Sequence, residues 1–207
     1  MIALINYGLG NIQAFVNVYQ RLHIPVSVAS SAEDILKADK LILPGVGHFD
    51  HAMQLFNASG MREVVEQQVL NQQVPILGIC VGMQMLANRS DEGNEQGLGW
   101  VEGEVKALKD KILPSLHLPL PHMGWNDVVP QLDNPLFAGF DAHDTRFYFL
   151  HSYYFACADA QHEIASADYG FNFCCAVNRA NVYGVQCHPE KSHHFGEQLL
   201  KNFAEKG

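Results

Sequence analysis

Two short segments of this chain carry residue types that could perform covalent chemistry. The first is Gly78-Ile-Cys80-Val-Gly82, in which an apolar run ends at a thiol between two glycines and a helical pattern follows. It is the cysteine counterpart of the Gly-x-Ser-x-Gly turn that presents a nucleophile between a strand and a helix. Glycines tolerate positive φ and close backbone approach, and the positive end of the helix dipole favours a thiolate. The pattern therefore predicts Cys80 as a nucleophile.

The second segment is His188-Pro-Glu190, which follows a short β-like run at 182–187. A histidine can act as the base for a thiol and a carboxylate can orient that histidine, so we predict a catalytic triad of Cys80, His188 and Glu190. Each segment alone has an ordinary explanation, because cysteine is often a small buried hydrophobe and many histidines are structural. Both segments lie at the carboxyl ends of predicted strands, where open α/β sheets hold their sites, and this favours catalysis.

The elements that position these segments alternate between strand and helix in the first half of the chain. The predicted strands cover 2–6, 26–29 and 40–43, with the nucleophile strand beginning at residue 74. The predicted helices cover 11–22, 48–55, 61–71 and 83–88, with a brief helix that Ser31 caps. Such alternation is typical of a mostly parallel central sheet flanked by helices.

From Gly97 onward the pattern is mostly β. The strand candidates are 100–108, 146–156, 163–167, 174–178 and 182–187, while 116–129 has no helical period and 193–204 is a closing helix. We expect an α/β fold whose second half adds a smaller antiparallel or mixed β portion, laid against the first half. No repeat or linker interrupts the chain, so we expect a single domain over 1–207.

Composition excludes several classes of protein. The 207 residues are 48% hydrophobic and 17% charged, which is typical of a globular chain. The net charge of −9 without a Lys/Arg cluster disfavours nucleic acid as a partner. No signal peptide and no apolar stretch of roughly 20 residues is present, so we expect no membrane association. Five cysteines, an odd number, indicate reduced thiols and a cytoplasmic location.

Two further patterns suggest ligands and fail on inspection. Gly8-Leu-Gly10-Asn-Ile-Gln13 follows a strand and opens a helix, but position 13 is not glycine and no acidic residue stands near residue 29. The adjacent His193 and His194 lack the spaced partners of a metal site, and we expect them to be solvated. We therefore expect neither a cofactor nor a metal.

With these motifs in this order, the chain resembles the triad-type class I glutamine amidotransferases. More narrowly, it is similar to the glutaminase subunits of imidazole glycerol phosphate synthase. That similarity rests on Tyr7-Gly-Leu-Gly-Asn11, Leu43-Pro-Gly-Val-Gly47, Gly97-Leu-Gly99, Pro121-His-Met-Gly-Trp-Asn126, Phe149-Leu-His-Ser-Tyr153 and His188-Pro-Glu-Lys-Ser192. Together these segments span nearly the whole chain, and their combination is far more specific than any one of them.

The resemblance implies a mechanism and a set of binding residues. Cys80 would attack the glutamine amide, His188 would carry the proton to ammonia, and Glu190 would orient the imidazole. The N–H of Val81 and the loop 44–47 would bind the oxyanion. The loop would provide its donor only after a peptide rotation that the partner controls. The residues implied for the oxyanion and for glutamine are Val46, Gly47, Val81, Gln84, Glu92, Ser152 and Tyr153.

The resemblance also implies a partner, because the chain carries no module for the ammonia acceptor. The expected partner is a (β/α)₈-barrel cyclase subunit, of the HisF type, which forms a heterodimer and uses the ammonia in histidine biosynthesis. The implied interface residues are Asn11, Met123, Trp125 and Lys191. A paralogous glutaminase that supplies ammonia for amidination of a surface-polysaccharide sugar is the alternative, and the sequence does not name the acceptor. A cysteine hydrolase and a non-catalytic binding subunit fit the complete motifs less well.

Overall fold

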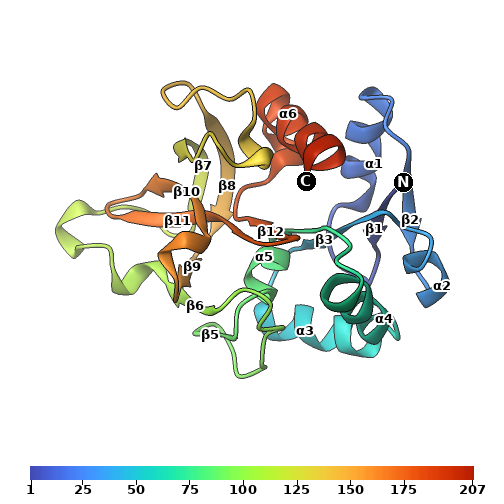
Figure 1. The fold of residues 1–207 in the computed structure, drawn as a ribbon. Coiled ribbons are helices and arrows are strands. Elements are labelled where there is room, and N and C mark those ends of the chain that lie inside the picture. The colour runs from blue at the N-terminus through green and yellow to red at the C-terminus, as the bar shows by residue number, and fades with distance from the viewer.

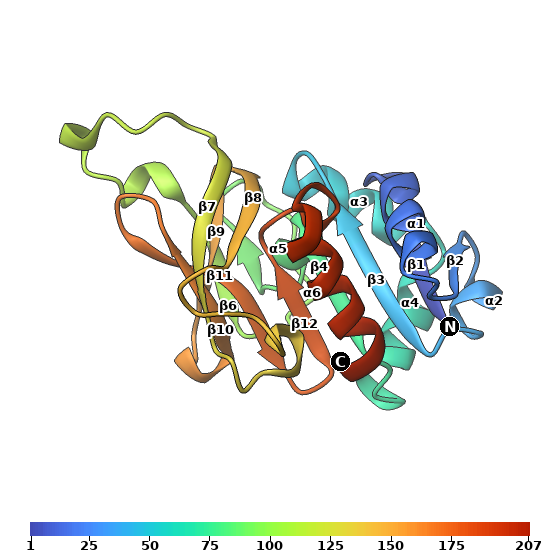
Figure 2. The same ribbon diagram turned by 90° about the horizontal axis from the view of Figure 1, so that it is seen from above.

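The apolar runs of the first half form the parallel part of a twisted sheet. The computed structural model describes residues 1–207, and its 12-stranded sheet crosses the whole molecule (Figure 2). The parallel strands are β1 (Ile2–Ile5), β2 (Val26–Ala29), β3 (Lys40–Gly45), β4 (Ile76–Cys80) and β12 (Val182–Val185), in the order β2-β1-β3-β4-β12. The strands that end at the two predicted catalytic segments, β4 and β12, are therefore neighbours.

Helices cover both faces of the parallel strands (Figure 1). One face carries α1 (Ile12–Arg21) and α6 (His193–Lys206), and the other carries α3 (Phe49–Ala58) and α4 (Arg62–Glu66), which a π-helical turn extends to residue 71. The short helix α2 (Ala32–Ile35) begins at Ser31, whose hydroxyl accepts the N–H of Asp34 at 3.3 Å, so the predicted cap is confirmed. No helix is long and apolar enough to cross a bilayer.

The second half continues the same sheet with antiparallel strands. These are β6 (Gly103–Ala107), β7 (His122–Pro130), β8 (Arg146–His151), β9 (Tyr153–Cys157), β10 (Glu163–Asp168) and β11 (Asn172–Arg179). A short β5 (Arg89–Ser90) pairs parallel with β6. Because β11 pairs antiparallel with β12, the second half joins the parallel part edge to edge. The expected parallel and antiparallel portions are confirmed, but the expectation that one is laid against the other is wrong.

Two strand predictions differ from the structure for local reasons. The predicted strand 146–156 is two strands, because the chain breaks at Ser152, whose carbonyl accepts the N–H of Leu108 at 2.9 Å. The proline-bearing stretch 116–129 holds β7, which we did not predict as a strand. Pro121 precedes β7 and Pro130 ends it, so prolines bound this strand and leave its interior free to pair.

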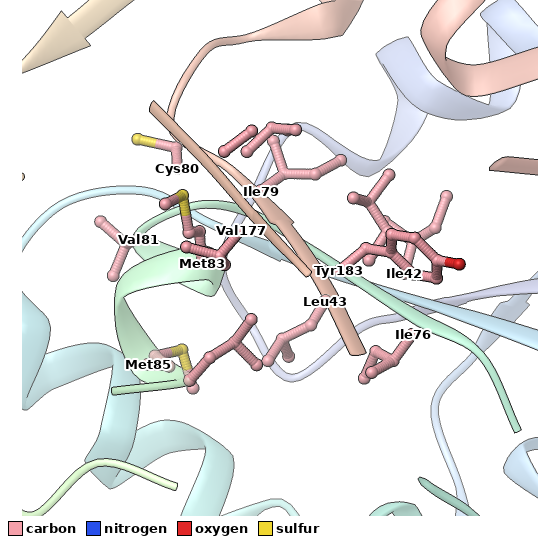
Figure 3. Close-up of a cluster of buried hydrophobic side chains, with 14 of the residues drawn as sticks. Ile42, Leu43, Ile76, Ile79, Cys80, Val81, Met83, Met85, Val177 and Tyr183 are labelled. Carbon is pink, nitrogen blue, oxygen red and sulfur yellow. The ribbon is translucent and has the colours of Figure 1, made fainter. Parts of the chain in front are cut away.

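One hydrophobic core joins the two halves. A cluster of 56 buried residues runs from Ile2 to Phe203. Figure 3 shows the part around β4, where Val177 of β11 and Tyr183 of β12 pack with residues of β3 and β4. Cys80 lies at the rim of this cluster with its sulfur directed away from the aliphatic side chains. The core thus fixes the backbone of the predicted nucleophile and leaves its thiol outside.

Candidate active site

A strained turn presents the predicted nucleophile. Cys80 ends β4, α5 (Val81–Met85) begins at the next residue, and the cysteine itself has φ 55° and ψ −114°. L-residues rarely adopt this conformation, which costs free energy that the surrounding packing must offset. The flanking glycines serve close approach, since a Cβ at Gly82 would lie 1.9 Å from the carbonyl oxygen of Leu43. The expected close approach at the glycines is therefore confirmed, while the positive φ lies at Cys80 itself and not at Gly78 or Gly82.

The structure brings the three predicted triad residues together. Cys80 and His188 are each 5% exposed and both line one cavity, and Nδ1 of His188 lies 2.9 Å from Oε1 of Glu190. Burial alone lowers the pKa of His188, but hydrogen bonding and negative charge from Cys80 and Glu190 raise it to about 10. The arrangement therefore favours the imidazolium form of His188 at neutral pH.

The histidine segment is held from two sides. The backbone N–H of His188 donates to the carbonyl of Tyr148 at 2.8 Å, which ties it to β8. The hydroxyl of Ser192 donates to the carbonyl of His188 at 2.7 Å and accepts the N–H of Tyr148 at 3.0 Å. The side chain of Glu190 is 3% exposed, and its Oε2 has no hydrogen-bond partner. The imidazole of His188 is therefore the hydrogen-bond partner of this side chain.

A cavity of about 460 Å³ opens above the sulfur, large enough for an amino acid. Every residue that the resemblance implied for the oxyanion or for glutamine lines it: Val46, Gly47, Val81, Gln84, Glu92, Ser152 and Tyr153. Gly47 has φ 86°, so the loop 44–47 reaches the cavity through a glycine in the left-handed region. The carboxylate of Glu92 accepts the N–H of Phe49 at 2.9 Å, which links this wall to the start of α3. The roles of these residues remain predictions.

Some residues of the site escaped the sequence analysis. Pro121, Leu150 and His151 also line the cavity. Gln186 is fully buried, and its Nε2–H donates to the Cys80 sulfur at 3.8 Å. A signal for Gln186 was available, since an amide within an apolar run such as Val185 to Cys187 must find buried partners. The structure contains no group of three His, Cys, Asp or Glu side chains that could hold a metal ion.

The predicted interface residues lie around the cavity and at the turn before α1. Met123 and Trp125 are 65% and 43% exposed on the outer face of β7, while His122 turns inward and is buried. Period-two alternation along a strand explains this separation. Lys191 is exposed and lines the cavity, and Asn11 is exposed before α1.

The two adjacent histidines after Lys191 differ in their surroundings. Both His193 and His194 are exposed, as expected. The His193 ring stacks on Trp125 with their centroids 5.5 Å apart, so one face of His193 is covered. The contact joins the start of α6 to the outer face of β7.

Comparisons with known proteins identify relatives over nearly the whole chain. The model of the family "Glutamine amidotransferase class-I" matches residues 3–206. A protein of Bdellovibrio bacteriovorus named imidazole glycerol phosphate synthase subunit HisH is 59% identical, and the match covers 99% of this chain and all of that protein. A protein of Leptospira interrogans with the same name is 47% identical over 99% of both chains.

Solved structures share the fold at low sequence identity. A crystal structure of a glutamine amidotransferase superimposes with a TM-score of 0.75 at 19% identity, covering 99% of this chain and 97% of the other. The structure of PurLQS from Thermotoga maritima gives a TM-score of 0.73 at 15% identity, with coverages of 98% and 96%. The architecture described above is therefore shared with proteins whose sequences have diverged widely.

Proposed function

This chain belongs to the class-I glutamine amidotransferase family, and we propose that it is the glutaminase subunit of an imidazole glycerol phosphate synthase. One observation carries the glutaminase activity. Cys80 and His188 meet in a single cavity, with Glu190 behind the histidine, and every implied glutamine-binding residue lines its wall. The names of the relatives support histidine biosynthesis as the destination of the ammonia, and the comparisons favour no sugar-amidinating role. We further propose that residues 1–207 form one domain.

The proposed reaction uses the triad in two stages. The Cys80 thiolate attacks the side-chain amide carbon of glutamine, and the His188 imidazolium gives its proton to the nitrogen that leaves as ammonia. Water then attacks the γ-glutamyl thioester, neutral His188 takes a proton from that water, and glutamate leaves as the thiolate forms again. Glu190 holds the imidazole in one orientation through both stages and stabilises its positive charge.

Backbone donors would stabilise the oxyanion of each tetrahedral intermediate. Val81 follows the nucleophile and begins α5, so its N–H belongs to the free donors of a helix start. Val46 and Gly47 line the same cavity and would supply the second donor. Removal of one such donor typically lowers the rate by about 10²–10³. A change in the conformation of this loop would therefore act as a switch on the activity.

Ammonia released into water would be protonated and diluted, so the function requires a partner docked over the cavity. We propose a (β/α)₈-barrel cyclase subunit that forms a heterodimer with this chain. Met123 and Trp125 are exposed on the outer face of β7, and this strand begins directly after Pro121, which lines the cavity. The outer face of β7 is therefore our proposed docking surface. Asn11 and Lys191 would contact the same partner. All five cysteines are unpaired, which supports a cytoplasmic location.

The test is a glutaminase assay on the purified chain, alone and with a barrel cyclase from the same source plus the acceptor substrate. We expect weak activity alone, a strong rise with the partner, and no activity in Cys80→Ala. Copurification from source cells, followed by identification of the bound protein, tests the acceptor separately. Equal turnover with and without the cyclase, or recovery of a sugar-modifying partner instead, would contradict the proposal.

A further inference from the structure

The backbone carbonyl of Tyr153 fixes the direction of several buried hydrogen bonds. It lies 2.7 Å from Nδ1 of His151 and 3.3 Å from Nε2 of Gln84. A carbonyl oxygen only accepts, so His151 carries its hydrogen on Nδ1 and Gln84 turns its NH₂ group toward Tyr153. Both side chains therefore have one orientation, which a backbone atom of β9 determines.

The Gln84 amide in turn orients Gln186. Nε2 of Gln84 also lies 3.0 Å from Oε1 of Gln186, so the Gln186 oxygen accepts and its NH₂ group faces the other way. That NH₂ group lies 3.8 Å from the sulfur of Cys80. The backbone of Gln186 is held as well, because its N–H donates to the carbonyl of Cys175 at 2.8 Å. The orientation of this donor is thus set by the side chain of Gln84 and by the backbone hydrogen bond to Cys175.

A second set of bonds keeps the His151 end in place. The tautomer of His151 leaves its Nε2 as an acceptor, and Nδ1–H of His122 donates to it at 2.9 Å. Asn126 donates to Nε2 of His122 at 3.3 Å and to the carbonyl of Asp168 at 2.7 Å. Burial lowers the pKa of His122 to about 4 and that of His151 to about 3, so both stay neutral and keep these tautomers at neutral pH.

We propose that Gln186 is a further catalytic residue, whose amide N–H donates a hydrogen bond to the Cys80 sulfur and stabilises its thiolate. This inference rests on the proposed function, in which Cys80 is the nucleophile. The bond forms in a buried site, where a donor stabilises a charge more strongly than in water. It also persists when His188 has given up its proton, so it stabilises the thiolate as the leaving group of thioester hydrolysis.

The experiment measures the rate of Cys80 alkylation by iodoacetamide against pH, with mass spectrometry to assign the labelled cysteine. In Gln186→Met, which has similar size but no donor, the midpoint of the pH profile should rise by about one to two pH units, as expected for a hydrogen bond to a charged group. Gln186→Glu should raise it further by like charge. Gln20→Met, at an exposed position of α1, is the matched control and should leave it unchanged. An unchanged midpoint in folded Gln186→Met would overturn the inference.

The same labelling data separate the role of Gln186 from that of Cys80. If Cys80 of the unmodified protein is not labelled ahead of the other cysteines, the proposed function fails. If it is labelled first but Gln186→Met has the same midpoint, only the role of Gln186 fails. Should the variants not fold, NMR of the wild-type chain decides, because the Gln186 side-chain amide signal should move with the midpoint of alkylation. An amide signal that stays fixed across that pH range would overturn the inference.

Discussion

Replacing Cys80 by glycine and by alanine measures the strain in the nucleophile turn. Both variants remove the sulfur, so they differ by one methyl group and by the conformations that each residue accepts. At an unstrained site alanine is more stable than glycine by about 0.5–1 kcal/mol, because glycine loses more entropy on folding. At φ 55° and ψ −114° a residue with a Cβ is strained by about 1–3 kcal/mol, and glycine is not. The order should therefore reverse, with Cys80→Gly more stable than Cys80→Ala by about 1–2 kcal/mol.

Urea denaturation of the two inactive variants, followed by circular dichroism, gives this difference directly. A chain of this length should also show a melting temperature higher by about 2–8 °C in Cys80→Gly. The matched control is Ala14→Gly in the first turn of α1, where glycine should lower stability by up to about 1 kcal/mol. If Cys80→Ala equals or exceeds Cys80→Gly in stability, the backbone at position 80 is not strained and the turn has been described wrongly.

Three further predictions concern pH and packing. The pKa of His188 in the folded protein, about 10, lies above the ordinary 6.5, so the folded protein holds a proton that the unfolded chain releases. The free energy of unfolding should therefore fall as pH rises from 6.5 to 10. In Glu190→Gln the urea midpoint should fall less over this pH range. His122 and His151 have lowered pKa values, so the stability that their neutral forms contribute is present above pH 6.5. It should fall as the pH is lowered toward 4. A urea midpoint that stays constant from pH 6.5 to 4 would contradict this. Gly196→Ala would place a Cβ 1.8 Å from the carbonyl oxygen of Pro189, next to His188. We expect this variant to be destabilised by about 1–3 kcal/mol in a urea titration and to have reduced glutaminase activity. Wild-type stability and activity would contradict the packing.

The sequence patterns predicted that Cys80 and His188 lie at the carboxyl ends of strands, but they did not predict the order of those strands. Cys80 and His188 each follow an apolar strand, and β4 and β12 are parallel neighbours, so both residues reach the same edge of the sheet. The placement of the two candidates follows from the general position of sites in open α/β sheets. The inward turn of His122 and the exposure of Trp125 were not predicted, because no strand was predicted over 116–129.

Other features depend on contacts that local patterns do not encode. The positive φ of Cys80 occurs in a turn where Gly82 closely approaches the strand at Leu43, and this is a tertiary contact. The orientation of Gln186 depends on side chains and carbonyls from several separate elements. The edge-to-edge pairing of β11 with β12 is likewise a tertiary choice, since a strand sequence does not specify its neighbour.

The central claim is that Cys80 is the activated nucleophile of a site that binds glutamine. Its most direct test is labelling with a glutamine-like electrophile, such as a diazo ketone of the amino acid, followed by mass spectrometry of all five cysteines. We expect one equivalent of label on Cys80, protection by excess glutamine, and much slower labelling in His188→Ala. Equal labelling of the five cysteines, or a Cys80 rate that neither glutamine nor His188→Ala changes, would contradict it.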